Sequence, residues 1–160
     1  MASADQGDAS GRLTLRSPAF DDGTAIPREY GYTKQNISPP LEIEGVPAEA
    51  KSLALVMDDP DAMKPAGQVW DHWTVWNIDP GTSEIAEGDS PPGAVEGTNS
   101  YGSRGYGGPN PPDGEHAYRF VLYALDTELS LESGATKSHL ERAIDGHVLG
   151  EARLTGTYAP

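Results

Sequence analysis

The alternation of apolar and polar residues predicts a chain built mainly from short strands. In residues 11–17, Leu13 and Leu15 alternate with polar neighbours, as in a strand with one buried face. Residues 52–57 (SLALVM) form a continuous apolar run, which is typical of a strand covered on both faces. The other segments rich in β-forming residues are 72–78, 118–125 and 152–158.

Strand geometry also predicts which side chains of the segment HWTVWNI share a face. Because successive side chains point to opposite sides of a strand, one face should carry His72, Thr74, Trp76 and Ile78. The other face should carry Trp73, Val75 and Asn77.

One segment near the C-terminus, residues 138–150 (SHLERAIDGHVLG), has a helical pattern. Ser138 and Glu141 have the spacing of a capping box, and Gly150 can end the helix. The apolar stripe consists of Leu140, Ala143, Ile144 and Val148. We expect His139 and His147 to be surface or helix-end residues.

Many strands followed by a late helix predict a mainly β protein: an antiparallel β-sandwich with a peripheral helix in the C-terminal region. Glycine and proline are spread from Pro18 to Pro112 instead of marking one linker, which favours many short strands, and a length of 160 residues is typical of one compact domain. We therefore predict a flexible tail over residues 1–12 and one domain over residues 13–160.

Composition narrows the chemistry and the partners. The 25 acidic and 11 basic side chains give a formal charge of −14, which disfavours binding to nucleic acid and stable association with membranes. Scattered acidic residues and only four lysines resemble the surface of a salt-adapted, halophilic protein. The absence of cysteine excludes disulfides, thiolate nucleophiles and cysteine-based metal sites. With no apolar run long enough to span a membrane, we expect a cytoplasmic protein.

Polar residues gather where buried strands meet turns. Asp58, Asp59 and Asp61 directly follow the apolar run 52–57, so at least one carboxylate should be partly desolvated and need a partner. His72 and His116 each begin a strand and are the available partners. Glycines 105, 107 and 108, with the prolines of the segment 105–118, indicate a rigid loop that allows close approach of a ligand.

An aspartate beside two histidines would raise both imidazole pKa values, and the two rings could then donate hydrogen bonds to an anion. The Tyr118 hydroxyl and loop amides would add donors. The same residues allow two other interpretations, a metal triad of two histidines and one carboxylate, or an Asp–His general base. No serine lies with them at a recognisable nucleophile spacing, which counts against acyl transfer.

In these segments the sequence resembles the phosphatidylethanolamine-binding protein family, which includes the Raf kinase inhibitor protein and prokaryotic YbhB/YbcL-type members. The motifs are NISPPL (36–41), LALVMDDPDA (53–62), HWTVWNI (72–78) and the long segment 97–126 containing GPNPPDGEHAY. DPDA, then HW, then GPxPPxGxHxY in this order is a highly specific combination.

The resemblance implies an antiparallel β-sandwich with a small surface pocket for phosphate-like anions and the phosphorylethanolamine headgroup. It also implies a non-catalytic protein without a cofactor that modulates a kinase or protease partner, as a monomer or homodimer. By position, the ligand-binding residues would be Asp59, His72, His116, Tyr118, Trp70, Gly108 and Pro111. The alternative is a hydrolase or metal-dependent enzyme that uses the same Asp/His/His pocket.

Three positions depart from the family pattern. Met63 stands where a proline often follows DPDA, and Ala117 replaces a common arginine. Asn110 occupies a variable loop position and could add a side-chain donor or acceptor to the pocket.

Overall fold

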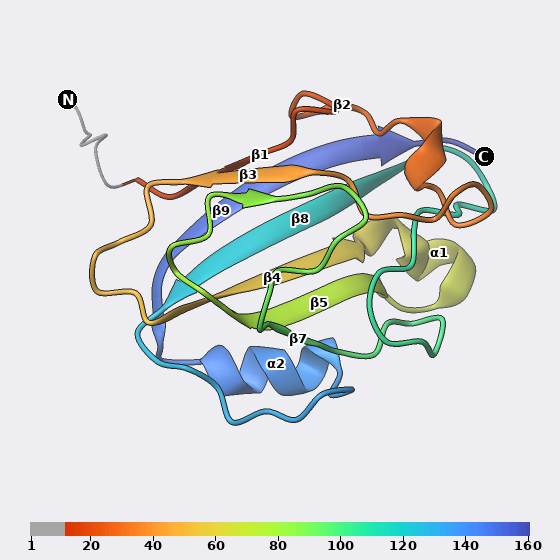
Figure 1. Cartoon of the computed structure of the whole chain (residues 1–160). Helices are drawn as coiled ribbons and strands as arrows, with labels where there is room; N and C mark the ends of the chain where they lie inside the picture. Colours follow the sequence, from red (N-terminus) through yellow and green to blue (C-terminus); the bar gives the residue numbers. More distant parts are fainter. Residues whose placement is uncertain (1–11) are drawn as a thin grey trace.

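Two β-sheets pack face to face in the structure, a computed structural model that describes residues 12–160 (Figure 1). The predicted tail, residues 1–12, lies outside the described residues except for Arg12. The strands are β1 (Thr14–Arg16), β2 (Thr24–Ala25), β3 (Leu41–Glu44), β4 (Ser52–Asp59), β5 (Trp70–Ile78), β6 (Glu84–Ile85), β7 (Val95–Glu96), β8 (His116–Leu125) and β9 (Val148–Tyr158). The helices are η1 (Arg28–Tyr30), η2 (Pro60–Ala62), α1 (Met63–Ala66) and α2 (Lys137–Ile144).

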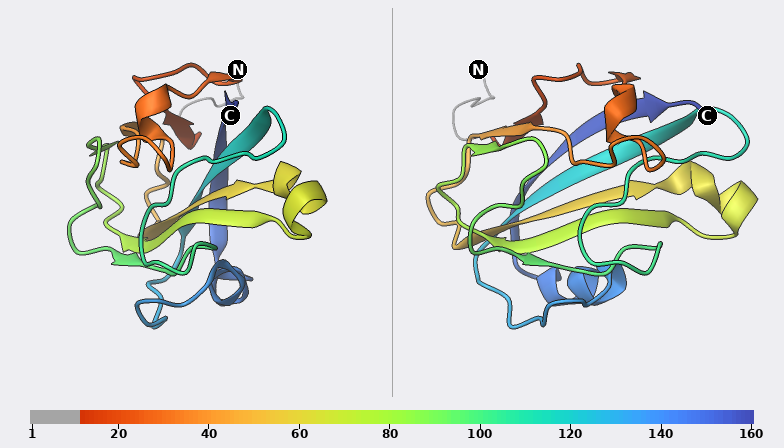
Figure 2. Two further views of the ribbon diagram at one scale, coloured as in Figure 1. Left: turned by 90° about the vertical axis from the view of Figure 1, so that its right-hand side faces the viewer. Right: turned by 45° about the vertical axis from the view of Figure 1, so that its right-hand side comes forward.

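The larger sheet has the strand order β2-β9-β8-β4-β5-β7, and the smaller one has the order β1-β3-β6. All pairings are antiparallel apart from the two-residue strand β2 on β9. The main core lies between the two sheets, and α2 covers the opposite face of the larger sheet over a second apolar cluster (Figure 2). The predicted mainly β sandwich with a peripheral helix is confirmed.

The strand β4 is buried along its whole length. All eight of its residues are buried, because β5 and β8 flank it and apolar clusters cover both of its faces. Leu53, Leu55 and Met57 face the smaller sheet, whereas Ala54 and Val56 face α2. Asp58 and Asp59, at the end of the strand, therefore point to opposite sides.

The predicted faces of β5 are wrong at both ends, because the strand contains two irregularities. Met57 pairs with Trp73 but Asp58 pairs with Asp71, so His72 is an extra residue in a β-bulge. The bulge turns His72 to the side of Tyr118, away from Thr74 and Trp76. Near the other end, Asn77 has a φ of 55°, and Ile78 joins the main core instead of the α2 face.

The predicted helix 138–150 is too long at its C-terminal end. The helix α2 ends at Ile144, Gly146 adopts a left-handed φ of 82°, and β9 begins at Val148 to pair with β8. The capping residue is Thr136 and not Ser138: its side chain accepts from the backbone of His139, whose ring accepts from the Thr136 amide in return. His139 is thus a helix-end residue as expected.

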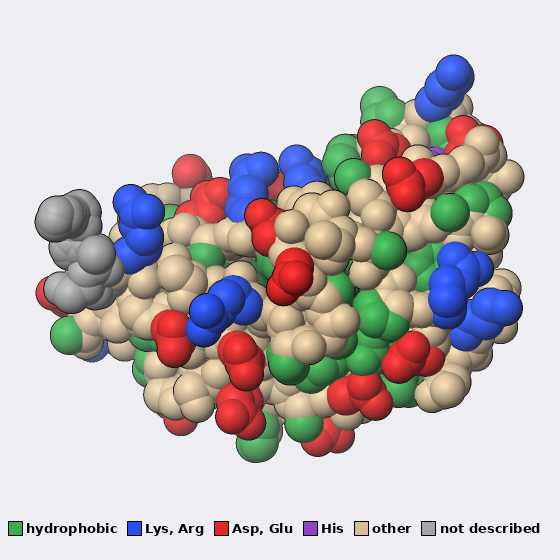
Figure 3. All heavy atoms as spheres, turned by 90° about the horizontal axis from the view of Figure 1, so that it is seen from above, with side chains coloured by type: hydrophobic (Ala, Val, Ile, Leu, Met, Phe, Trp, Pro, Cys, Tyr) green, Lys and Arg blue, Asp and Glu red, His purple; other side chains and the backbone are tan. Residues whose placement is uncertain are grey.

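Charged side chains are dispersed over the face that Figure 3 shows, without a large cluster of one sign. No helix among residues 12–160 is long and apolar enough to cross a membrane.

Candidate functional site

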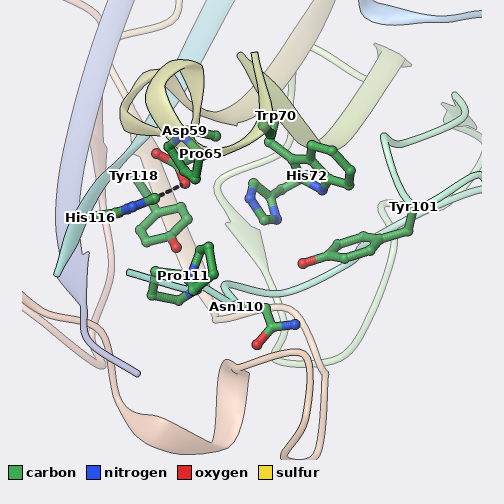
Figure 4. Close-up of a pocket in the computed structure, with 12 residues that line it drawn as sticks. Asp59, Pro65, Trp70, His72, Tyr101, Asn110, Pro111, His116 and Tyr118 are labelled. Atoms are coloured by element: carbon green, nitrogen blue, oxygen red, sulfur yellow. Dashed lines mark hydrogen bonds and ion pairs between the residues drawn. The ribbon is translucent and has the colours of Figure 1, made fainter. Parts of the chain in front are cut away.

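A cavity of about 210 Å³ opens at the end of the larger sheet where β4 ends and β5 and β8 begin (Figure 4). It is lined by Asp59, Ala62, Pro65, Ala66, Trp70, His72, Tyr101, Asn110, Pro111, Pro112, His116 and Tyr118. Six of the seven residues singled out from the sequence therefore surround one cavity. The exception is Gly108.

Asp59 lies at the buried end of β4, with only 3% of its surface exposed. Its Oδ1 accepts a hydrogen bond from the Asp61 amide at 2.9 Å, so the carboxylate also caps the short helix η2. Its Oδ2 lies 2.6 Å from Nδ1 of His116. Burial raises the pKa of Asp59, although the His116 hydrogen bond and charge act in the opposite direction.

His116, the first residue of β8, is held between two carboxylates. Its Nδ1 contacts Asp59, and its Nε2 lies 2.7 Å from Oδ1 of Asp113. Burial alone would lower the pKa of His116, but the hydrogen bonds to the two carboxylates outweigh it and raise the pKa. The predicted Asp–His pair is therefore present, and the two carboxylates favour the protonated form of His116.

His72 behaves differently from the expectation that one aspartate raises the pKa of both rings. Its Nδ1 donates to the Gly107 carbonyl at 2.6 Å, and no hydrogen bond joins it to Asp59 within residues 12–160. Burial lowers the pKa of His72 to about 4, more than the Gly107 carbonyl and the Asp58 charge raise it. The expected second imidazolium is thus wrong, because the bulge places this ring in a largely buried position in the cavity wall.

Two buried hydrogen-bond donors in the cavity wall have no partner within the described part of the chain. They are Nε1 of Trp70 and the hydroxyl of Tyr118. Burial is the main cause that raises the pKa of Tyr118, and the nearby Asp59 carboxylate acts in the same direction, so the hydroxyl keeps its proton. Unsatisfied buried donors are rare in native proteins, and they indicate where a water or ligand would be held.

The loop before β8 is fixed by hydrogen bonds to other loops. The Gly108 amide donates to Asn36 Oδ1 at 2.8 Å, and its carbonyl accepts from the Tyr101 hydroxyl at 2.8 Å. A Cβ at Gly108 would lie 2.1 Å from the Tyr30 carbonyl oxygen. Gly108 therefore allows two backbones to pack together. Contrary to the expectation, it does not line the cavity. Pro111 does line it.

The remaining aspartates of DDPDA have separate tasks. Asp58 points toward α2, where it accepts two hydrogen bonds from Arg119 and one from Lys137. Lys137 also pairs with Asp71 at 2.9 Å. Asp61 Oδ2 accepts from the amide of Ala117 at 2.8 Å and so joins η2 to the start of β8.

Sequence reasoning missed Asp113 and Tyr101 as parts of the site. The signal for Asp113 was its position three residues before His116, which lets the loop fold back onto the ring. Tyr101 gave no signal of its own, although it lies in the segment 97–126, because it stacks on the distant Tyr32 with ring centroids 3.9 Å apart. Among residues 12–160, no group of three or more acidic or histidine side chains is arranged to hold a metal ion.

Comparison with known proteins agrees with the resemblance found in the sequence. The family model described as phosphatidylethanolamine-binding protein matches residues 16–159. A UPF0098 protein of Methanothermobacter thermautotrophicus is 50% identical over 151 residues, covering 91% of this chain and 98% of that protein.

Two solved structures are similar over nearly their whole length. The crystal structure of the phosphatidylethanolamine-binding protein homologue CT736 from Chlamydia trachomatis has 46% identity and a TM-score of 0.88, covering 93% of this chain and 98% of that one. For YbcL of Escherichia coli the identity is 30% and the TM-score 0.85, with 92% and 98% covered. The chain described here belongs to the phosphatidylethanolamine-binding protein family.

Proposed function

We propose that this protein is a non-catalytic binding protein whose cavity takes a small phosphate-like anion, such as inorganic phosphate or phosphorylethanolamine. The ligand-binding side chains would be Asp59, Trp70, His72, Pro111, His116 and Tyr118, with Gly108 holding the loop behind them. One observation carries the proposal: His116, whose protonated form is favoured by two carboxylates, shares a cavity with two buried donors that have no hydrogen-bond partner among residues 12–160.

Three donors in one small cavity favour an oxyanion over an apolar ligand. Trp70 Nε1 and the Tyr118 hydroxyl each lose a hydrogen bond when the chain folds, and an oxyanion could supply both acceptors. The carboxylate of Asp113, which now accepts from His116 Nε2, is 47% exposed. An incoming anion can therefore replace this carboxylate, which then moves into solvent.

The hydrogen bonds of His116 and the lowered pKa of His72 support the enzymatic alternative less well than a binding role. Both nitrogens of His116 already contact carboxylates, so no free lone pair is left for a metal or a substrate proton. His72 has one free nitrogen, but a pKa of about 4 makes it a weak general base at neutral pH. A binding role needs neither a strong base nor a nucleophile.

The four histidines of the chain provide the test, because two lie in the cavity and two lie outside it. Titration with inorganic phosphate or phosphorylethanolamine, followed by the histidine ring signals in NMR spectra, should move His72 and His116 with one shared saturation curve. His139 and His147, at the ends of α2, should not move. If the cavity histidines stay unchanged at millimolar ligand, or all four move alike, the proposal fails.

Modulation of a kinase or protease partner stays a prediction that rests on the family resemblance. It would be tested by measuring whether replacement of the cavity histidines changes the binding of a captured partner. The cytoplasmic location, the salt-adapted surface and the monomeric or dimeric state also stay predictions.

A further inference from the structure

The hydrogen bond between His72 and Gly107 fixes which ring nitrogen carries the proton. A backbone carbonyl can only accept, so Nδ1 must donate across the 2.6 Å to Gly107. In the neutral ring, Nε2 then carries a lone pair and can only accept. Within residues 12–160 this nitrogen has no hydrogen-bond partner, although its ring lines the cavity.

The cavity therefore presents donors and an acceptor close together. The His72 ring meets the Tyr118 ring edge-on at 5.2 Å and the Tyr101 ring at 5.8 Å between centroids. Figure 4 shows His72 reaching between Trp70 and Tyr118. A ligand that satisfies this wall needs oxygen acceptors for Trp70 and Tyr118 and one O–H group for His72. A fully deprotonated oxyanion would set its own lone pair against that of Nε2.

The charge around the cavity leads to the same requirement. His116 is the cationic side chain among the residues that line it, and Asp59 and Asp113 already share that charge. Asp58 acts on His72 from the other side of the sheet and is neutralised by Arg119 and Lys137. Such a cavity offers little compensation for a second negative charge, so a monoanion is the better guest.

We propose that the cavity selects the singly protonated form of a phosphate monoester, whose P–OH group donates to Nε2 of His72. This inference rests on the proposed anion-binding function and names the ligand class within it. Phosphate diesters and sulfate lack the required O–H and are discriminated against. The intact phospholipid headgroup is a diester, so a free phosphomonoester is the expected occupant.

Ethyl phosphate and dimethyl phosphate make a matched pair of probes, because they are isomers and only the first has a P–OH group in its monoanion. At about pH 5.5, below the second phosphate pKa of about 6, both carry mainly one negative charge. His72 is still neutral there, with its pKa of about 4. Ethyl phosphate should bind at least about tenfold more tightly, because bound dimethyl phosphate would cover Nε2 of His72 and leave this acceptor unpaired.

The variant His72→Asn tests the assignment to this residue. The asparagine amide can still donate to the Gly107 carbonyl, but it does not reach the position of Nε2. The preference for ethyl phosphate should fall to within about twofold. A thermal unfolding curve shows whether the variant folds. Independently of the variant, the Nε2 signal of the wild-type ring in ¹⁵N NMR spectra should move with ethyl phosphate and not with dimethyl phosphate.

The outcomes distinguish selection by His72 from the proposed anion binding on which it rests. Equal affinities for the two isomers with a clear response of His116 would overturn the selection by His72 and leave anion binding intact. The same holds if sulfate competes as well as phosphate does. If neither isomer binds, both proposals are overturned. Glycerophosphorylethanolamine, the soluble diester headgroup, should bind more weakly than phosphorylethanolamine.

Discussion

Asp58 and Asp59 are adjacent in the chain and almost equally buried, at 4% and 3% exposed, yet their surroundings differ completely. Asp58 faces α2 and accepts three hydrogen bonds from Arg119 and Lys137. Asp59 faces the cavity and shares His116 with a second carboxylate. Strand alternation alone sends the two carboxylates to opposite sides of the sheet.

The difference separates an ion cluster from the proposed binding site. On the α2 side Asp58 and Asp71 pair with Arg119 and Lys137. On the cavity side two carboxylates share one imidazolium, and two donors lack partners. Buried polar atoms without a hydrogen-bond partner occur on both sides among residues 12–160, since the Thr74 hydroxyl also lacks one. The cavity and the uneven charge around His116 therefore distinguish the proposed binding side of β4.

The largest effect should come from Asp58→Asn. The substitution removes the carboxylate that Arg119 and Lys137 share, and we expect the free energy of unfolding to fall by about 3 kcal/mol. Urea denaturation measures the loss. Phosphate affinity of the folded variant should be unchanged, and Glu44→Gln, in an exposed pair with Arg16, should cost less than about 0.5 kcal/mol. A stable Asp58→Asn variant would contradict the structural role of the cluster.

The next largest effect is expected for His116→Asn. The asparagine amide can replace Nδ1 as donor to Asp59, but it removes the positive charge and the Nε2 donor. Phosphate affinity, measured by calorimetry, should fall about 30-fold because a charge-assisted hydrogen bond is lost. The matched control is His147→Asn, which removes a half-exposed histidine at the far end of α2. Equal affinities of the two variants would rule out a contact between His116 and the anion.

A smaller effect of opposite sign should follow from Asp113→Asn. Asp113 is the carboxylate that the anion must displace from His116, so its neutralisation should raise phosphate affinity about threefold, a typical gain for a partly exposed charge. The control Glu115→Gln removes the same charge two residues away on an exposed side chain. If both variants gain affinity equally, the gain comes only from the less negative electrostatic potential of the loop. Asp113 then does not compete with the anion for the His116 ring.

The smallest effects should appear in the pH dependence of stability. Burial would lower the pKa of His116, but its two carboxylates raise it. Its contribution is therefore complete below the unfolded value of about 6.5 and is lost as the pH rises through the raised folded value. Asp58 is the reverse case: burial would raise its pKa, but Arg119 and Lys137 lower it.

The contribution of Asp58 is thus complete above about pH 4 and is lost as the pH falls through its lowered folded value. Unfolding free energies measured from acid to alkaline pH should show both losses in the wild type. Asp58→Asn should flatten the acid side only, and His116→Asn the neutral to alkaline side only. A variant that flattens both sides would show that the two regions are coupled through β4.

The sequence predicted the sandwich, its four main strands and six of the residues that line the cavity, because apolar runs, β-formers and the DPDA, HW and GPxPPxGxHxY motifs are local signals. The ionisation state of His72 could not be predicted in this way. It depends on the Gly107 carbonyl and on burial, which exist only after the loop and the bulge have formed. The position of Gly108 in the cavity wall was predicted wrongly for a related reason, since the backbone that this residue approaches lies about 80 residues earlier, at Tyr30.

The extra residue at position 72 has a consequence for how this protein can vary. A strand register changes in whole steps, so deleting one residue here would exchange the orientations of Trp70 and Asp71. The indole would leave the ligand side, and Lys137 would lose its second carboxylate at the same time. The indole in the cavity wall and the carboxylate that pairs with Lys137 thus both depend on the one extra residue at position 72.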